Sequence, residues 1–375
     1  MVKDMLMAST SEPIEKMFLI NSLYRLGVSY HFENEIEEHL NLLFDSLPEH
    51  IEDNDYDLYT IAVIFQVFRL HGYKMLCDVF SKFQDGDGKF KEALISDIKG
   101  MISLYEASHF RMNGELILDE ALAFTTKHLE SLANQSSPHL GEYIVNALFR
   151  PYHHGMQRLE ARQYISFYEK DESRNDVLLK FGKYDFNRIQ LLLEQELSVL
   201  SSWYKELNLK CKFPYARQRI VESALGIYFE PCYARGRNII AKLAALAGIL
   251  DDVYEAYGLY EELQSFTDAI QRFDISAMDE LTANYQKILY ETILDVHDEV
   301  ENQEAIKTFR EKLAVRWKDI NEGCMRTTPV PQQILRRALN YARLLDFAYR
   351  DDDQYTKPEL FKDGITKVLI HPIPL

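Results

Sequence analysis

The chain has 375 residues and a mass of 43.9 kDa, which is enough for two domains of ordinary size and a sizeable buried core. Its composition, with 47% hydrophobic and 27% charged residues but only 15 Gly and 11 Pro, excludes a disordered, collagen-like or low-complexity protein. The formal net charge of −17 would repel a polyanion, so we expect no nucleic-acid partner.

Apolar residues recur at helical spacing along nearly the whole chain. Near the start, Leu19, Ile20, Leu23 and Leu26 lie on one face of a helix, and runs of β-branched residues with tight-turn signals are scarce. The Gly and Pro residues fall between the helical segments. The sequence therefore predicts an all-α fold.

A polar stretch at residues 169–176 separates the first helical part from a long amphipathic run at residues 177–207. We expect a domain boundary there. The prediction is an N-terminal helical domain of residues 1–170 and a C-terminal domain of residues 171–375.

Three features bear on the compartment. The longest nearly apolar stretch, residues 239–250, is too short to span a bilayer and contains Lys242. The first residues lack the pattern of a signal or transit peptide. The four cysteines are widely spaced, which suggests neither a zinc site nor a disulfide framework. We therefore expect a cytoplasmic protein without a membrane span.

The strongest local feature is the apolar pattern of residues 239–250 followed by Asp251, Asp252 and Glu255. If the helix continues, the acids are spaced by three and four residues, so the three carboxylates share one face. Mg²⁺ takes carboxylate oxygens and keeps waters and substrate phosphates as its other ligands, so this face suits a metal–diphosphate site. The alternative interpretation is a solvated acidic helix end.

Two Arg-x-Arg motifs precede these acids, one with Arg217 and Arg219 and the other with Arg235 and Arg237. Guanidinium groups are permanently charged and bind phosphate oxygens in two directions. Such a motif beside a carboxylate–metal cluster would hold a leaving diphosphate. The alternative is that these arginines pair with surplus surface acids.

Other polar motifs carry less chemistry. Residues 85–89 are better interpreted as a tight turn than as a calcium loop, and the acids at 351–353 precede a helix-breaking proline. The His153–His154 pair has no carboxylate or cysteine at metal-ligand spacing.

Taken together, these residues resemble a family. The stretch from residue 217 to residue 258 contains R-Q-R, I-Y-F-E-P and L-D-D-V-Y-E-A-Y-G, and it resembles the class I active-site region of plant terpene synthases. The branch it resembles is that of the cytosolic, cadinene-synthase-like sesquiterpene synthases. Further segments agree along nearly the whole chain, among them R-L-E-A-R at 158–162 and W-K-D-I-N at 317–321.

The resemblance implies an enzyme that uses Mg²⁺, with Mn²⁺ as a substitute. It would ionise a prenyl diphosphate, with farnesyl diphosphate as the expected substrate, release diphosphate and cyclise the carbocation. By the same resemblance, the metal ligands are Asp251, Asp252 and Glu255, with Glu255 in place of the usual Asp. The residues assigned to the diphosphate and to a closing loop are Arg217, Arg219, Asp353 and Tyr355.

The sequence departs from the family pattern in four ways. Residues 352–359 begin like the second metal motif but are interrupted by a proline. The chain passes from residues 294–302, which resemble one family helix, almost directly to residues 304–309, which resemble a much later one, so we expect an internal block of several helices to be missing. Residues 221–226 are shorter than the family helix, and the N-terminal paired-Arg motif has no counterpart.

These departures support a second hypothesis. The chain would be a catalytically inactive, truncated relative or a splice product that binds an isoprenoid diphosphate or a protein partner. A purely structural helical protein is a third option, but it leaves the Arg and acidic motifs unexplained. The sequence determines neither the terpene product nor the oligomeric state.

Overall fold

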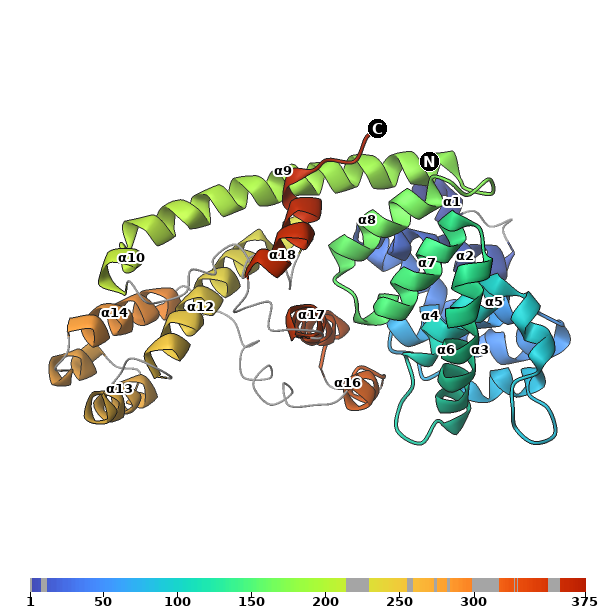
Figure 1. Ribbon diagram of the computed structural model, residues 1–375, viewed down its shortest axis with the longest axis horizontal. Helices are drawn as coiled ribbons and strands as arrows, with labels where there is room; N and C mark the ends of the chain where they lie inside the picture. The colour runs from blue at the N-terminus through green and yellow to red at the C-terminus, as the bar shows by residue number, and fades with distance from the viewer. Residues whose placement is uncertain are drawn as a thin grey trace. The chain divides into compact units, whose positions relative to one another are not determined.

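In the computed structural model the chain is built from helices (Figure 1). The structure describes residues 2–7, 12–213, 229–254, 259–272, 275–281, 284–298, 317–326, 328, 330–349 and 358–375. Within these ranges there is no β-strand, only an isolated bridge between Gln84 and Phe90. The predicted all-α fold is therefore confirmed. None of the described helices combines the length and the apolar character that crossing a membrane requires.

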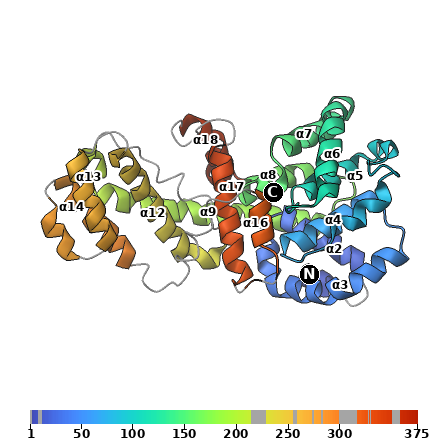
Figure 2. The same cartoon turned by 90° about the horizontal axis from the view of Figure 1, so that it is seen from below.

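The first compact unit combines the chain up to Asn187 with two helices from the C-terminal part, α16 and α17 (Figures 1 and 2). Short 3₁₀ helices connect its α-helices. The described α-helices of this unit, besides the first part of α9, are α1 (Val2–Met7), α2 (Pro13–Arg25), α3 (Glu33–Asp53), α4 (Leu58–Leu70), α5 (Ile98–Ser108), α6 (Leu116–Gln135), α7 (Pro138–Phe149), α8 (Gln157–Tyr168), α16 (Trp317–Gly323) and α17 (Gln332–Tyr349), the last of which belongs to this unit up to Phe347.

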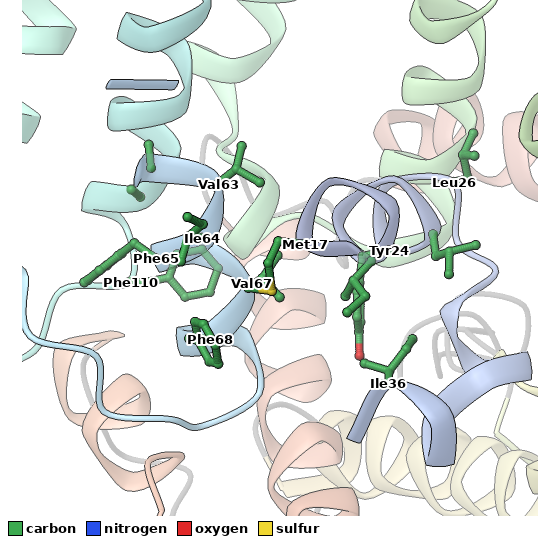
Figure 3. Close-up of a cluster of buried hydrophobic side chains, with 14 of the residues drawn as sticks. Met17, Tyr24, Leu26, Ile36, Val63, Ile64, Phe65, Val67, Phe68 and Phe110 are labelled. Carbon is green, nitrogen blue, oxygen red and sulfur yellow. The ribbon is translucent and has the colours of Figure 1, made fainter. Parts of the chain in front are cut away.

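Helix α4 is the most buried helix of this unit because its sequence, LYTIAVIFQVFRL, is apolar on nearly every side. Phe65 and Phe68 have no exposed surface, and Figure 3 shows them in the same buried cluster as Met17. The helix begins at Asp57, whose carboxylate accepts a hydrogen bond from the backbone N–H of Thr60 at 2.8 Å. This N-cap satisfies a donor that the first helical turn leaves free.

Two further helices of this unit begin with side-chain caps. Asp97 accepts a hydrogen bond from the backbone N–H of Gly100 at the start of α5, and Ser137 accepts one from Leu140 at the start of α7. Pro138 occupies the first position of α7, where its missing N–H is not needed. The local sequence thus sets where these helices start.

Helix α9 (Asp176–Glu206) matches the predicted amphipathic run. The chain passes from the first unit to the second within this helix, after Asn187. The domain boundary expected between residues 170 and 171 stays a prediction.

The second compact unit contains the rest of α9, the following helices up to α14, and α18. Its described core includes Ile249, Phe266, Leu289 and Tyr290, none of which has exposed surface. The hydroxyl of Tyr290 donates to the carbonyl of Ala269 at 2.9 Å, so the one polar atom of this buried ring is satisfied. The described α-helices that follow α9 in this unit are α10 (Leu209–Lys212), α12 (Ala234–Asp252), α13 (Tyr260–Arg272), α14 (Asn284–Asp298) and α18 (Pro358–Ile365).

Candidate functional site

The structure describes two of the predicted site residues, and both lie at the C-terminal end of α12. These are Asp251 and Asp252. The other predicted site residues lie outside the described residues: Arg217, Arg219, Glu255, Asp353 and Tyr355. Their assignment stays a prediction.

Helix α12 is fixed at its N-terminal end by Arg237, whose side chain is buried. The Nε and Nη2 atoms of Arg237 donate to the two carboxylate oxygens of Glu196 on α9, each at 2.7 Å. Its Nη1 donates to the carbonyl of Glu230, also at 2.7 Å. A bidentate pair of this kind is both strong and specific in direction. It therefore holds the start of α12 against α9, although the N-cap residue Tyr233 makes no side-chain capping hydrogen bond.

These contacts decide between the two interpretations of Arg237. Arg237 donates to an acid and to a backbone carbonyl, so this arginine pairs with a carboxylate, but in a buried position rather than at the surface. Sequence analysis missed the partner because Glu196 is 41 residues away in the chain, and no spacing rule connects positions that far apart.

The two aspartates at the other end of α12 have different surroundings. Asp251 is exposed, whereas Asp252 is only 7% exposed. Successive residues of an α-helix point about 100° apart, which explains the difference. Asp252 lies close enough to Tyr204 of α9 that its charge, after the larger effect of burial, contributes to raising the pKa of that tyrosine.

The chain beyond α12 is tied to α13. Val253 and Tyr254 continue the helical backbone in a wider turn, and the hydroxyl of Tyr254 is 2.9 Å from the Oγ1 atom of Thr267. The ring of Tyr254 also lies 6.2 Å from that of Phe266, centroid to centroid. These contacts hold the acidic end of α12 beside the apolar core of the second unit.

The donor chemistry at this helix end fits a divalent cation. Carboxylate oxygens are the hard donors that Mg²⁺ prefers, and the C-terminal end of a helix carries a partial negative charge that attracts cations. Asp251 and Asp252 supply two such carboxylates. Among the residues that the structure describes, no group of three or more His, Cys, Asp or Glu side chains is placed to hold a metal ion. The third predicted ligand, Glu255, lies outside that part of the chain.

Comparison with known proteins finds two family matches in the chain. Residues 1–148 match the family described as "Terpene synthase, N-terminal domain", and residues 205–328 match "Terpene synthase family, metal binding domain". The chain is 36% identical over 501 residues to (-)-germacrene D synthase of Vitis vinifera, an alignment that covers 100% of the chain and 89% of the grape protein. The chain belongs to the terpene synthase family. The resemblance inferred from the sequence is thus confirmed.

The lengths of the relatives are informative. "Probable terpene synthase 6" of Ricinus communis is 55% identical over 316 residues, which make up 80% of this chain but 57% of that protein. This terpene synthase chain therefore spans little more than half the length of that relative. The alignment with the grape protein runs over 501 residues and takes in the whole chain of 375, so the grape protein has residues within the aligned region that lack a counterpart here. The predicted position of the gap, near Asn302, lies outside the described residues.

The fold agrees with that of solved relatives. The isoprene synthase of grey poplar leaves (Populus x canescens) superposes with a TM-score of 0.85 at 25% sequence identity, covering 100% of this chain and 93% of the poplar chain. The expected likeness to the class I terpenoid synthase fold is confirmed.

Proposed function

We propose that this chain is a sesquiterpene synthase, a lyase that ionises farnesyl diphosphate in the presence of Mg²⁺ and releases diphosphate and a terpene. The observation that carries the proposal is the Asp251–Asp252 pair at the C-terminal end of α12. This helix is held by the buried Arg237–Glu196 pair and lies within the part of the chain that matches the family's metal-binding domain. We propose a cytoplasmic location for this activity, as the sequence resemblance to cytosolic sesquiterpene synthases implies.

Each predicted residue has a role in this proposal. Bound Mg²⁺ would neutralise the charge that builds on the diphosphate as it leaves. The ligands would be Asp251, Asp252 and Glu255, with Mn²⁺ as a substitute metal. The remaining roles, holding the diphosphate and closing the site, belong to Arg217, Arg219, Asp353 and Tyr355.

The test is a product assay on the purified chain. Farnesyl diphosphate and Mg²⁺ are added, and the headspace hydrocarbons are identified by gas chromatography and mass spectrometry, with a chelator control and a parallel assay on geranyl diphosphate. We expect a metal-dependent terpene from the farnesyl substrate. Asp251→Asn and Asp252→Asn should each lower its rate by at least ~100-fold, because each removes a charged ligand.

The matched control is Asp268→Asn. Asp268 is an exposed acid on α13 of the same unit, so its loss changes the net charge by the same amount without touching the end of α12. Equal rates for all three variants would show that the acid pair does not bind the metal.

A second candidate function is binding without turnover. It is favoured by the length of the grape alignment, which shows that residues are missing from this chain. The family resemblance implies that they include part of the pocket wall and the second set of metal ligands. In this case the folded chain would bind a non-hydrolysable farnesyl diphosphate analogue with Mg²⁺ in calorimetry but release no hydrocarbon. Transcript sequence around Asn302 would then show whether an exon has been skipped.

A further inference from the structure

Within the first unit, polar contacts join α16, α17 and the residues between them to the N-terminal part of the chain. The Nζ atom of Lys318 on α16 donates to the carboxylate of Asp119 on α6 at 2.9 Å. Other ion pairs between the N-terminal part and residues 317–347 are Arg326–Glu37, Arg336–Glu33 and Arg150–Asp346. Two buried histidines from the N-terminal part, His71 and His153, complete these contacts.

His71 follows the last residue of α4 and is 2% exposed. Its Nδ1 atom is 3.1 Å from Nη2 of Arg336 on α17. A guanidinium has donors only, so Nδ1 must accept this hydrogen bond and the proton of the neutral ring must be on Nε2. Protonation of Nδ1 would place two donors and two positive charges against each other. The hydrogen bond between Arg336 and His71 therefore exists only while His71 is neutral.

His153 is 3% exposed, and its Nε2 atom is 2.7 Å from Oδ1 of Asn321 on α16. The amide nitrogen of Asn321 donates to the carbonyls of His109 and Arg111, both at 3.0 Å, so the oxygen of Asn321 faces His153 and Nε2 is the donor. The other ring nitrogen, Nδ1, is then unprotonated, and it is buried without a hydrogen-bond partner among the described residues. A second proton would create a buried donor with no acceptor.

The surroundings of both rings oppose a positive charge. The groups that face His71 are the Tyr24 ring, the guanidiniums of Arg336 and Arg326, and, paired with those guanidiniums, Glu33 and Glu37. The groups that face His153 are Phe110, His109, His154, Trp317, Asn321 and Arg343, whose Nε donates to the carbonyl of His153 at 2.8 Å. Burial, and then the neighbouring arginines, hold the pKa of both histidines well below the ordinary value of 6.5.

We propose that His71 and His153 form a pH-sensitive latch that holds α16 and α17 on the N-terminal helices while both rings are neutral and releases them on acidification. In the released state the rings reach water and regain their ordinary pKa. This state therefore binds more protons below pH 6.5, and the attached state loses stability as the pH falls through that value. At pH 5.5 each histidine should raise the released population about tenfold, and both together about 100-fold.

The test is amide hydrogen exchange of the full chain at pH 7.5 and pH 5.5, corrected for the intrinsic effect of pH on exchange. We expect the protection factors of residues 332–349 to fall by about 100-fold, while those of α5, a buried helix of the same unit without histidine, change little. Unchanged protection in α17 would overturn the proposal. An equal loss in α5 and α17 would also overturn it, because the whole unit would then be unfolding.

Variants identify the histidines responsible. His71→Gln keeps an acceptor for Arg336 but cannot be protonated, so the pH effect on α17 should fall about tenfold. The exposed His371 gives the control, since His371→Gln should leave the effect unchanged. If His71→Gln does not fold, Arg336→Gln removes the opposing charge instead and should weaken the effect. A full pH effect in these His71 and Arg336 variants would contradict the latch.

Discussion

The helices α4 and α12 begin in different ways. Helix α4 of the first unit starts at Asp57, whose side chain caps a backbone N–H three residues later. Helix α12 of the second unit starts at a residue without a side-chain cap, and its first turn is held by the bidentate contact of Arg237 with Glu196. The start of α4 is therefore stabilised by a neighbouring residue in the sequence, whereas the start of α12 is stabilised by a residue 41 positions away.

The difference has an energetic consequence. A capping side chain contributes about 1 kcal/mol and acts on a helix whose apolar faces already define its place. A buried ion pair that loses one partner leaves an uncompensated charge, which costs several kcal/mol. We therefore expect the loss of Arg237 to destabilise the second unit more than the loss of the Asp57 cap destabilises the first.

The largest loss of stability should come from truncating a large buried side chain in either core. Phe68 and Phe266 are both fully buried, the first in the core that includes α4 and the second in the core of the second unit. Replacing either with Ala should lower the free energy of unfolding by about 4 kcal/mol, because it removes apolar burial and leaves a cavity. Each substitution should affect only its own unit.

The two tryptophans make this separation measurable. Trp317 lies in the first unit and Trp203 packs against the core of the second. In a Trp203→Phe background, the fluorescence of Trp317 follows the denaturant unfolding of the first unit. In a Trp317→Phe background, the fluorescence of Trp203 follows the unfolding of the second unit. If Phe68→Ala and Phe266→Ala each shifted the unfolding midpoints measured with Trp317 and with Trp203 equally, the two cores would belong to one cooperative unit.

Breaking the anchor of α12 should have the next largest effect. Arg237→Ala leaves the Glu196 carboxylate without its bidentate donor, and the second unit should lose about 3 kcal/mol of stability. Arg237→Lys keeps the charge but loses the fork geometry, so an intermediate loss is expected. The control is Arg272→Ala, which breaks an exposed Arg–Glu pair on α13 and should change the Trp203 report much less. If Arg237→Ala and Arg272→Ala lowered the stability of the second unit equally, the burial of the Arg237–Glu196 pair would add nothing to that stability.

The same contrast explains what could be predicted from the sequence. The all-α fold, the extent of α9 and the family followed from apolar spacing and from local motifs, because those signals lie within a few turns of each other. The acid pair at the end of α12 was also predicted, since adjacent residues carry it. The partners of Arg237 and His153 were not, because Glu196 and Asn321 lie 41 and 168 residues away along the chain.

The pH dependence of the first unit extends this comparison. Burial, with a smaller contribution from Glu106, raises the pKa of Glu160 to about 8. In the unfolded chain this carboxyl has its ordinary pKa of 4.5, so the folded state retains a proton that the unfolded state releases. The free energy of unfolding should therefore decrease as the pH rises from 4.5 to 8, by at most about 1.4 kcal/mol per pH unit. The histidine latch acts in the opposite direction below pH 6.5.

Glu160→Gln should remove the decrease on the alkaline side. The Trp317 report of unfolding, measured from pH 6.5 to 8, should become flatter in this variant. The matched control is Glu130→Gln, an exposed position on α6 of the same unit, which should keep the slope of the parent chain. A slope that is the same in both variants would show that Glu160 is already ionised in the folded unit.

The smallest effect should come from the cap of α4. Asp57→Ala removes the acceptor of the Thr60 N–H and should lower the stability of the first unit by about 1 kcal/mol, visible in the Trp317 report alone. Asp57→Asn keeps a side-chain oxygen at the cap and should restore most of the loss. If Asn restored nothing, the carboxylate would act through its charge at the N-terminal end of the helix rather than as a hydrogen-bond acceptor, and the loss in Asp57→Ala would then shrink at high salt.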